Sequence, residues 1–160
     1  MKIMKRTKRG FFGAFTANFS GDAMSSAHAS REVQHSDAGW RRRLSSEQFR
    51  VLRRGATEPP FASPLLNERR DGLFECAGCG LALFSSAAKF DSGTGWPSFF
   101  MPMDGAVSTH VDTDLGMPRI EVHCRRCGGH LGHVFDDGPK PTGLRYCLNG
   151  AALKFQQTDA

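Results

Sequence analysis

The chain has 160 residues, of which 39% are hydrophobic and 23% are charged, and its formal net charge is +5. This length favours a single domain, and the share of apolar residues is typical of a globular protein. The sequence contains no run of about 18 apolar residues, which excludes a spanning helix. It also contains no repeat of about 20–50 residues, which excludes a solenoid.

The positive charge is concentrated in the first 45 residues. They carry nine Lys and Arg against three acidic residues, whereas the remaining 115 residues carry 12 basic and 13 acidic residues. The larger part of the chain is therefore close to neutral, which argues against a nucleic-acid-binding core.

Residues 1–43 are predicted to be a basic leader or a disordered arm. Residues 7–12 resemble a degenerate twin-arginine export signal, and residues 27–29 fit an A-x-A cleavage site. The composition also suits an organellar transit peptide, and a start at Met24 is a further interpretation. We expect a cytoplasmic protein, with export or an organelle as the alternative if residues 1–29 are a cleaved leader.

The predicted domain covers residues 44–160 and begins with a short helix. Ser45 and Gln48 fit a capping box, Phe49 and Leu52 have helical apolar spacing, and Gly55 can end the helix. The Pro-containing segment that follows is predicted to be extended or turning.

Short candidate strands, separated by Gly, Pro and Asp, follow from residue 72 onward. In one of them apolar and polar residues alternate, so Arg119, Glu121 and His123 are predicted to share a face. The pattern indicates a mainly β, antiparallel domain with little helix. The predicted strands are Leu73–Glu75, Leu81–Phe84, Val107–Val111, Arg119–His123, Val134–Phe135 and Leu144–Leu148.

Four of the five cysteines form two C-x-x-C pairs, each just after a predicted strand: Cys76, Cys79, Cys124 and Cys127. A two-residue spacer lets one tight turn aim both sulfurs at one point, so two such turns can make a tetrahedral thiolate site for Zn²⁺. Because all four positions are then filled, the zinc ion would be structural. The alternative is two disulfides or two redox pairs, but the βαβ setting of a redox C-x-x-C is missing.

Cys147 is the cysteine left over. By the period of a strand it shares a face with Arg145 and Asn149, and a neighbouring Arg favours the nucleophilic thiolate. Asn149 would offer donors and an acceptor to that face. A nucleophilic Cys147 and a buried, inert Cys147 are both compatible with the pattern.

Two further segments carry side chains suited to a site. His130 and His133 are candidates for a proton donor or a metal ligand, or for structural roles, and Asp137 could orient one of them. In residues 91–100 a Gly- and Pro-containing turn could expose Trp96 as the wall of a pocket, or Trp96 could be plain core.

Taken together, these segments resemble the methionine sulfoxide reductase B family, which acts on methionine-R-sulfoxide. The similarity runs from about Leu44 to Phe155, and its blocks are long. They are Thr57–Phe61, the first C-x-x-C pair, Phe90–Phe99, residues 124–139 with the sequence C-x-x-C-G-G-H-L-G-H-V-F-D-D-G-P, and Arg145–Asn149.

The resemblance implies two antiparallel β-sheets (β-tent-like) with a short N-terminal helix, and a structural Zn²⁺ held by the four paired cysteines. It implies that Cys147 attacks the sulfoxide sulfur and becomes a sulfenic acid. By position, the resemblance places His133 and His130 around the substrate oxygen. It places Asp137 and Asn149 in a network that positions the other groups. It also implies that Arg145 favours the thiolate and that Trp96 holds the substrate methyl group.

The sequence departs from the family at Thr94, where many members carry a second, resolving Cys, and at Gly150, where Ser is common. We therefore predict a one-cysteine peptide-methionine (R)-S-oxide reductase. Its substrate would be oxidised methionine in proteins or peptides. Its reductant would be thioredoxin, or glutaredoxin with glutathione. We expect a monomer that binds neither nucleic acid nor membrane.

Two other classes compete with the enzyme. A zinc-stabilised binding module needs only the four paired cysteines and makes no use of Cys147, His130, His133 and Trp96 together. A nucleic-acid-binding zinc protein would use the basic arm, but the near-neutral core argues against it.

Overall fold

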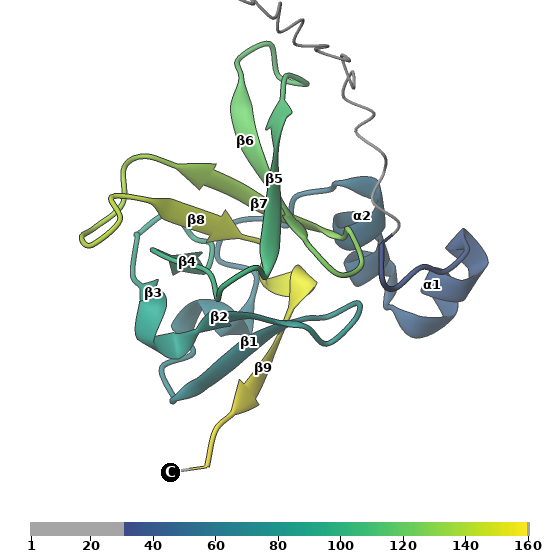
Figure 1. Cartoon of the computed structure of the whole chain (residues 1–160), viewed down its shortest axis with the longest axis horizontal. Helices are drawn as coiled ribbons and strands as arrows, with labels where there is room; N and C mark the ends of the chain where they lie inside the picture. The colour runs from purple at the N-terminus through teal and green to yellow at the C-terminus, as the bar shows by residue number, and fades with distance from the viewer. Residues whose placement is uncertain (1–30, 160) are drawn as a thin grey trace, which may run out of the picture.

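The computed structural model describes residues 31–159, which form two short helices and two antiparallel sheets (Figure 1). The helices α1 (Asp37–Arg43) and α2 (Ser46–Arg54) come first. The strands are β1 (Gly72–Cys76), β2 (Ala82–Ser85), β3 (Lys89–Phe90), β4 (Ser98–Phe99), β5 (Val107–Asp112), β6 (Arg119–Cys124), β7 (His130–Phe135), β8 (Arg145–Leu148) and β9 (Leu153–Gln157), and the short 3₁₀ turns are η1 (Pro64–Asn67), η2 (Ser86–Ala88) and η3 (Gly150–Ala152). The predicted mainly β class is confirmed.

Helix α2 forms as the sequence predicts. The Ser45 side chain accepts from the Gln48 amide, and the Gln48 side chain accepts from the Ser45 amide, which completes the capping box. Gly55 ends the helix in the left-handed region at φ 69°. Phe49 and Leu52 are buried, so the apolar face of α2 packs on the core.

Helix α1 lies before residue 44, where the predicted domain begins. Ser36 caps it, and the Trp40 side chain is only 1% exposed beneath the Arg53 guanidinium, 4.6 Å from the ring centre. Residues 37–43 therefore belong to the folded unit, and a buried Trp provides the burial that holds them there. The predicted export signal, the cleavage site and Met24 lie outside the described residues.

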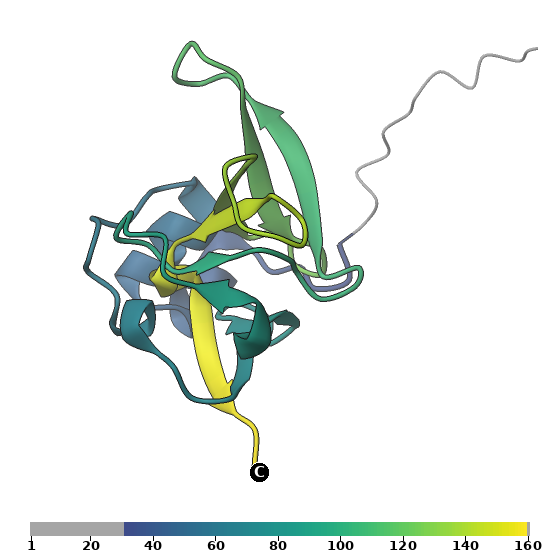
Figure 2. The same cartoon turned by 90° about the vertical axis from the view of Figure 1, so that its left-hand side faces the viewer.

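The smaller sheet has the strand order β2-β1-β9, and the larger has the order β3-β4-β8-β7-β6-β5. Phe99 of the larger sheet packs against Phe74 and Phe84 of the smaller one, with ring centroids 4.9 and 4.6 Å apart. The main core therefore lies between the sheets. Figures 1 and 2 both show the β5–β6 hairpin projecting away from the smaller sheet.

The six predicted strands all form, and β7 begins four residues earlier than predicted, at His130. Gly132 explains this extension: a Cβ there would collide with the Cys147 carbonyl oxygen, so only glycine allows β7 and β8 to pair here. Strands β3, β4 and β9 and helix α1 were not predicted. Among the described residues, no helix is both long and apolar enough to span a bilayer.

Candidate active site

One row of paired residues crosses the larger sheet. From β4 to β5 the row reads Ser98, Cys147, His133, Glu121 and His110, each directly opposite the next. Residues that face each other in antiparallel strands share a face of the sheet. The lone cysteine and one of the two candidate histidines are therefore neighbours on a single face.

The Cys147 thiol is half-buried, so it is reachable from solvent. Burial raises its pKa, whereas the Arg145 charge and hydrogen bonds from Thr94 and Arg145 lower it; burial is the larger effect. The Arg145 contribution therefore acts in the direction of the thiolate. The net shift is nevertheless upward, so the thiol form dominates near neutral pH.

His133 is oriented by Asp112 of β5. Its Nε2 lies 2.8 Å from Asp112 Oδ2, and the same oxygen accepts from the Arg119 guanidinium at 3.0 Å. The Asp114 amide and His133 lower the pKa of Asp112, so this carboxylate stays ionised. A carboxylate held this way fixes the ring, and Nδ1 of His133 is left to meet a reacting group.

His130 is oriented by Glu121 of β6. Its Nδ1 lies 2.6 Å from Glu121 Oε1, and its side chain is 5% exposed. Burial lowers the pKa of His130, so the neutral ring is favoured. Its Nε2 is buried and has no hydrogen-bond partner among the described residues. His130 and His133 lie side by side, with ring centroids 5.6 Å apart.

Asp137 does not orient either histidine. It accepts two hydrogen bonds from the Arg145 guanidinium, at 2.8 and 3.0 Å, and Arg145 lies over the Phe135 ring at 4.5 Å. Neither histidine forms a hydrogen bond with Asp137 among the described residues, because both of its oxygens face the Arg145 guanidinium. The effect of Asp137 falls on Arg145, and through it on Cys147.

Asn149 and Trp96 are linked by Glu58. The Asn149 side chain accepts from the Glu58 amide and donates to the Leu131 carbonyl, both at 3.0 Å. The Trp96 indole donates to the Glu58 carbonyl at 3.1 Å. Asn149 thus links the chain after Cys147 to Leu131 of β7 and to Glu58. The half-buried Trp96 ring bonds to the same residue, Glu58.

The Glu58 carboxylate is 4% exposed and accepts from the Gly150 and Ala151 amides. Burial raises the pKa of Glu58, and these two amides oppose that rise. Sequence reasoning placed Glu58 in an extended segment and gave it no role. The structure shows that it anchors the turn after β8.

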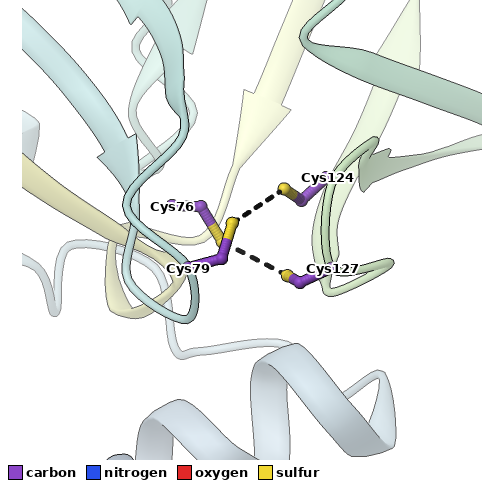
Figure 3. Close-up of side chains that lie close together, drawn as sticks. All are labelled: Cys76, Cys79, Cys124 and Cys127. Carbon is purple, nitrogen blue, oxygen red and sulfur yellow. Dashed lines mark hydrogen bonds between the residues drawn. The ribbon is translucent and has the colours of Figure 1, made fainter. Parts of the chain in front are cut away.

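The four paired cysteines converge (Figure 3). The β1–β2 turn brings Cys76 and Cys79, and the β6–β7 turn brings Cys124 and Cys127. Their sulfurs lie within 4.8 Å of one another, at 3.6 Å for Cys76–Cys127 and 3.5 Å for Cys79–Cys124, and none forms a disulfide. Metal–thiolate bonds of ~2.3 Å in a tetrahedron place sulfurs ~3.8 Å apart, so this cluster could hold a metal ion. Its sulfurs come from turns of both sheets.

Sequence reasoning missed three acidic side chains at the site: Glu58, Asp112 and Glu121. The alternation in residues 119–123 did place Glu121 on one face with His123, so a signal for Glu121 was present. The sequence contained no signal for Asp112, because Asp112 approaches His133 only through the pairing of β5 with β6 and of β6 with β7.

Comparison with known proteins points to the family that the sequence motifs resemble. The SelR domain family model matches residues 44–157. The chain belongs to the methionine sulfoxide reductase B family. A protein of Leptospira interrogans named peptide methionine sulfoxide reductase MsrB is 53% identical over 127 residues, which cover 79% of this chain and 97% of that protein.

Two further relatives carry the same name. The protein of Agrobacterium fabrum is 53% identical over 79% of this chain and 95% of its own length. That of Bradyrhizobium diazoefficiens is 56% identical over 78% of this chain and 91% of its own length. Residues 44–157, which the family model matches, include the sheet row, both histidines and all five cysteines.

Replacing Glu58 with Gln should lower the free energy of unfolding by about 1.5–3 kcal/mol, because an amide cannot accept from both the Gly150 and Ala151 amides as a carboxylate does. Urea unfolding measures the change. The matched control is Glu75→Gln, since Glu75 has no side-chain hydrogen bond among the described residues. Equal stability of E58Q and E75Q would contradict the anchoring role.

Proposed function

We propose that this protein reduces methionine-R-sulfoxide in peptides and proteins to methionine, and so repairs oxidative damage. The observation that carries the proposal is the pairing of Cys147 with His133 on one face of the larger sheet, beside His130. Membership of the family, and the activity named for its relatives, support the same conclusion.

The reaction begins at sulfur. The Cys147 thiolate attacks the sulfoxide sulfur, which becomes electrophilic once its oxygen is hydrogen-bonded or protonated. His133, with His130 beside it, supplies that proton, and general acid help of this kind is typically worth ~10²–10⁴ in rate. Collapse moves the oxygen to Cys147, giving methionine and a sulfenic acid. The sulfoxide gains two electrons and the Cys147 sulfur loses two.

The surrounding residues set the geometry of that step. Asp112 holds Nε2 of His133 and Glu121 holds Nδ1 of His130, so each ring keeps one nitrogen for the substrate. The Trp96 ring offers an apolar wall for the methyl group of the substrate. Hydrogen bonding on the oxygen and apolar contact on the methyl group together select one sulfur configuration, which is the basis for the R preference.

Regeneration requires a thiol from outside the chain. The other four cysteines are engaged in the cluster, and Thr94 occupies the position beside Cys147 where a resolving thiol would act. Two equivalents of an external thiol reduce the sulfenic acid, giving water, the Cys147 thiol and one new disulfide. Thioredoxin, or glutaredoxin with glutathione, would supply those thiols.

The four-cysteine cluster would hold Zn²⁺, because four thiolates in a closed tetrahedral set are a donor set typical of structural zinc. Cys76, Cys79, Cys124 and Cys127 would be the ligands. Zinc there supplies folding energy by joining the two sheets, and the chemistry remains with Cys147 and the histidines.

Cys147→Ser tests the proposed function. Without reductant, the wild-type protein should convert about one R-sulfoxide residue per chain to methionine within a test peptide, and no S-sulfoxide residue. C147S should convert none, because Ser lacks the polarizable thiolate nucleophile. Methionine is counted by mass spectrometry. C147S should unfold at the wild-type temperature, which shows that the fold is intact. Reduction of the sulfoxide by C147S would refute the proposal.

The pH dependence of Cys147 alkylation tests the role of Arg145. The thiol has a raised pKa, so the rate of alkylation by iodoacetamide should climb with pH as the thiolate forms. Arg145→Met removes the charge that lowers this pKa, so the rise should move to higher pH. Peptide mapping follows Cys147 alone. Arg70→Met, at an exposed Arg paired with Glu68, is the control and should leave the curve in place.

Metal analysis tests the zinc proposal. The purified chain should contain about one zinc ion per molecule, and its removal by a strong chelator should lower the unfolding temperature, because metal-binding energy is folding energy in such sites. Cys76→Ser should lose the metal, whereas C147S should retain it. A metal-free native chain, or an unchanged unfolding temperature after removal, would contradict the proposal.

A further inference from the structure

Beside the proposed active site, the larger sheet carries a second group of side chains that can bind metal: Glu121, His123 and His130. Each offers a ligand atom, and these atoms lie within 4.8 Å of one another. All three side chains are at most 23% exposed. Two histidines and one carboxylate are a donor set that divalent transition metals accept.

The position of His123 is fixed by the backbone. Its Nδ1 lies 3.0 Å from the Gly128 carbonyl oxygen. A carbonyl only accepts, so Nδ1 carries the proton, and in the neutral ring Nε2 has a free lone pair. Histidines that bind metal are usually oriented in this way, with the second ring nitrogen donating to a carbonyl or carboxylate.

The free nitrogen of His123 lies beside Glu121 but is not bonded to it. Nε2 is 2.9 Å from Glu121 Oε1, yet it makes no hydrogen bond with the described residues. Two ligands on one ion, with bonds of ~2.0–2.1 Å, lie about 2.9–3.4 Å apart and point at the ion instead of at each other. The spacing and the misalignment both fit two ligands of a common cation.

His130 completes the group from the neighbouring strand. It stands opposite His123 in the β6–β7 pairing, next to a register shift, and its Nδ1 contacts the same Glu121 oxygen at 2.6 Å. Its other nitrogen is buried without a partner among the described residues. In the tautomer that carries its proton on Nε2, Nδ1 has a free lone pair, so Nδ1 and the Glu121 oxygen could both bind one cation in place of this hydrogen bond.

We propose that Glu121, His123 and His130 form a second metal site, separate from the four-cysteine cluster, which takes a divalent transition metal such as Zn²⁺. The site has three protein ligands, so an open position remains for water. His130 belongs to both sites, and a ring whose Nδ1 carries a metal cannot become the doubly protonated imidazolium that gives up a proton, so metal binding here stops His130 from acting as an acid beside Cys147. The metal is therefore a reversible inhibitor, and this last step rests on the proposed function.

Zinc titration of the full chain, with the four-cysteine cluster already loaded, tests the binding. Calorimetry should detect one further equivalent of Zn²⁺. His123→Ala and Glu121→Gln should each weaken it at least tenfold, since loss of an outer-shell partner alone typically costs about 10–100-fold. His110→Ala is the matched control: His110 is exposed and packs edge-on against His123 at 4.9 Å, so its loss should leave the affinity within about twofold.

The Cys147 thiolate is the competing ligand, and C147S separates the two cases. The proposed site predicts that C147S keeps the further equivalent. Co²⁺ bound at the second site of that variant should then add no sulfur-to-metal charge-transfer band to the spectrum of the loaded cluster, because none of its ligands is sulfur. The proposal is overturned if the loaded wild-type chain takes up no further zinc, if H123A and E121Q both bind it as the wild type does, or if C147S alone abolishes it.

Inhibition is measured separately from binding. Zinc that inhibits sulfoxide reduction by the wild type should leave H123A active, and a mild chelator should restore the wild type. Binding with no inhibition would overturn the inhibitory role while leaving the metal site. A chain with no reductase activity at all would refute the proposed function, and the calorimetric result would still decide the metal site.

Discussion

In-register pairing of β8, β7 and β6 is the constraint on which the functional face depends. It sets Cys147 opposite His133, and His133 opposite Glu121. A slip of one residue would turn each strand's side chains to the opposite face and separate the thiol from the histidines. Gly132 makes the pairing possible, because any side chain there would meet the β8 backbone. The placement of Cys147 opposite His133 thus requires glycine at position 132, in the middle of β7.

Each histidine has its own carboxylate, and the two carboxylates act on opposite ring nitrogens. Asp112 binds Nε2 of His133, while Glu121 binds Nδ1 of His130. The rings are therefore fixed in different orientations although they lie side by side on one strand. Arg119 shares the Asp112 oxygen, so a positive charge stands behind that carboxylate. Asp112 therefore bonds to both His133 and Arg119, whereas Asp137 bonds to Arg145, two residues before Cys147.

The parts of the fold that the sequence predicted were those specified by local patterns. The capping box at Ser45, the alternation in residues 119–123 and the spacing of the C-x-x-C pairs need only a few neighbouring residues. Trp40, Glu58 and Asp112 were missed because each acquires its role from a distant segment. Trp40 lies under Arg53, Glu58 binds amides more than 90 residues away, and Asp112 reaches His133 across two strand pairings. A single sequence carries no local sign of such contacts.

The β6–β7 turn links the sulfur cluster to the histidines. Cys124 ends β6 directly after His123, and Cys127 is followed by two glycines that lead into His130. The Gly128 carbonyl binds His123, while the Cys124 amide binds the Gly129 carbonyl at 2.8 Å. The turn that presents two sulfurs to the cluster therefore also sets His123 opposite His130. Cys147 lies outside this turn, on β8, and the chain just after it is fixed by the bonds of Asn149 to Glu58 and Leu131.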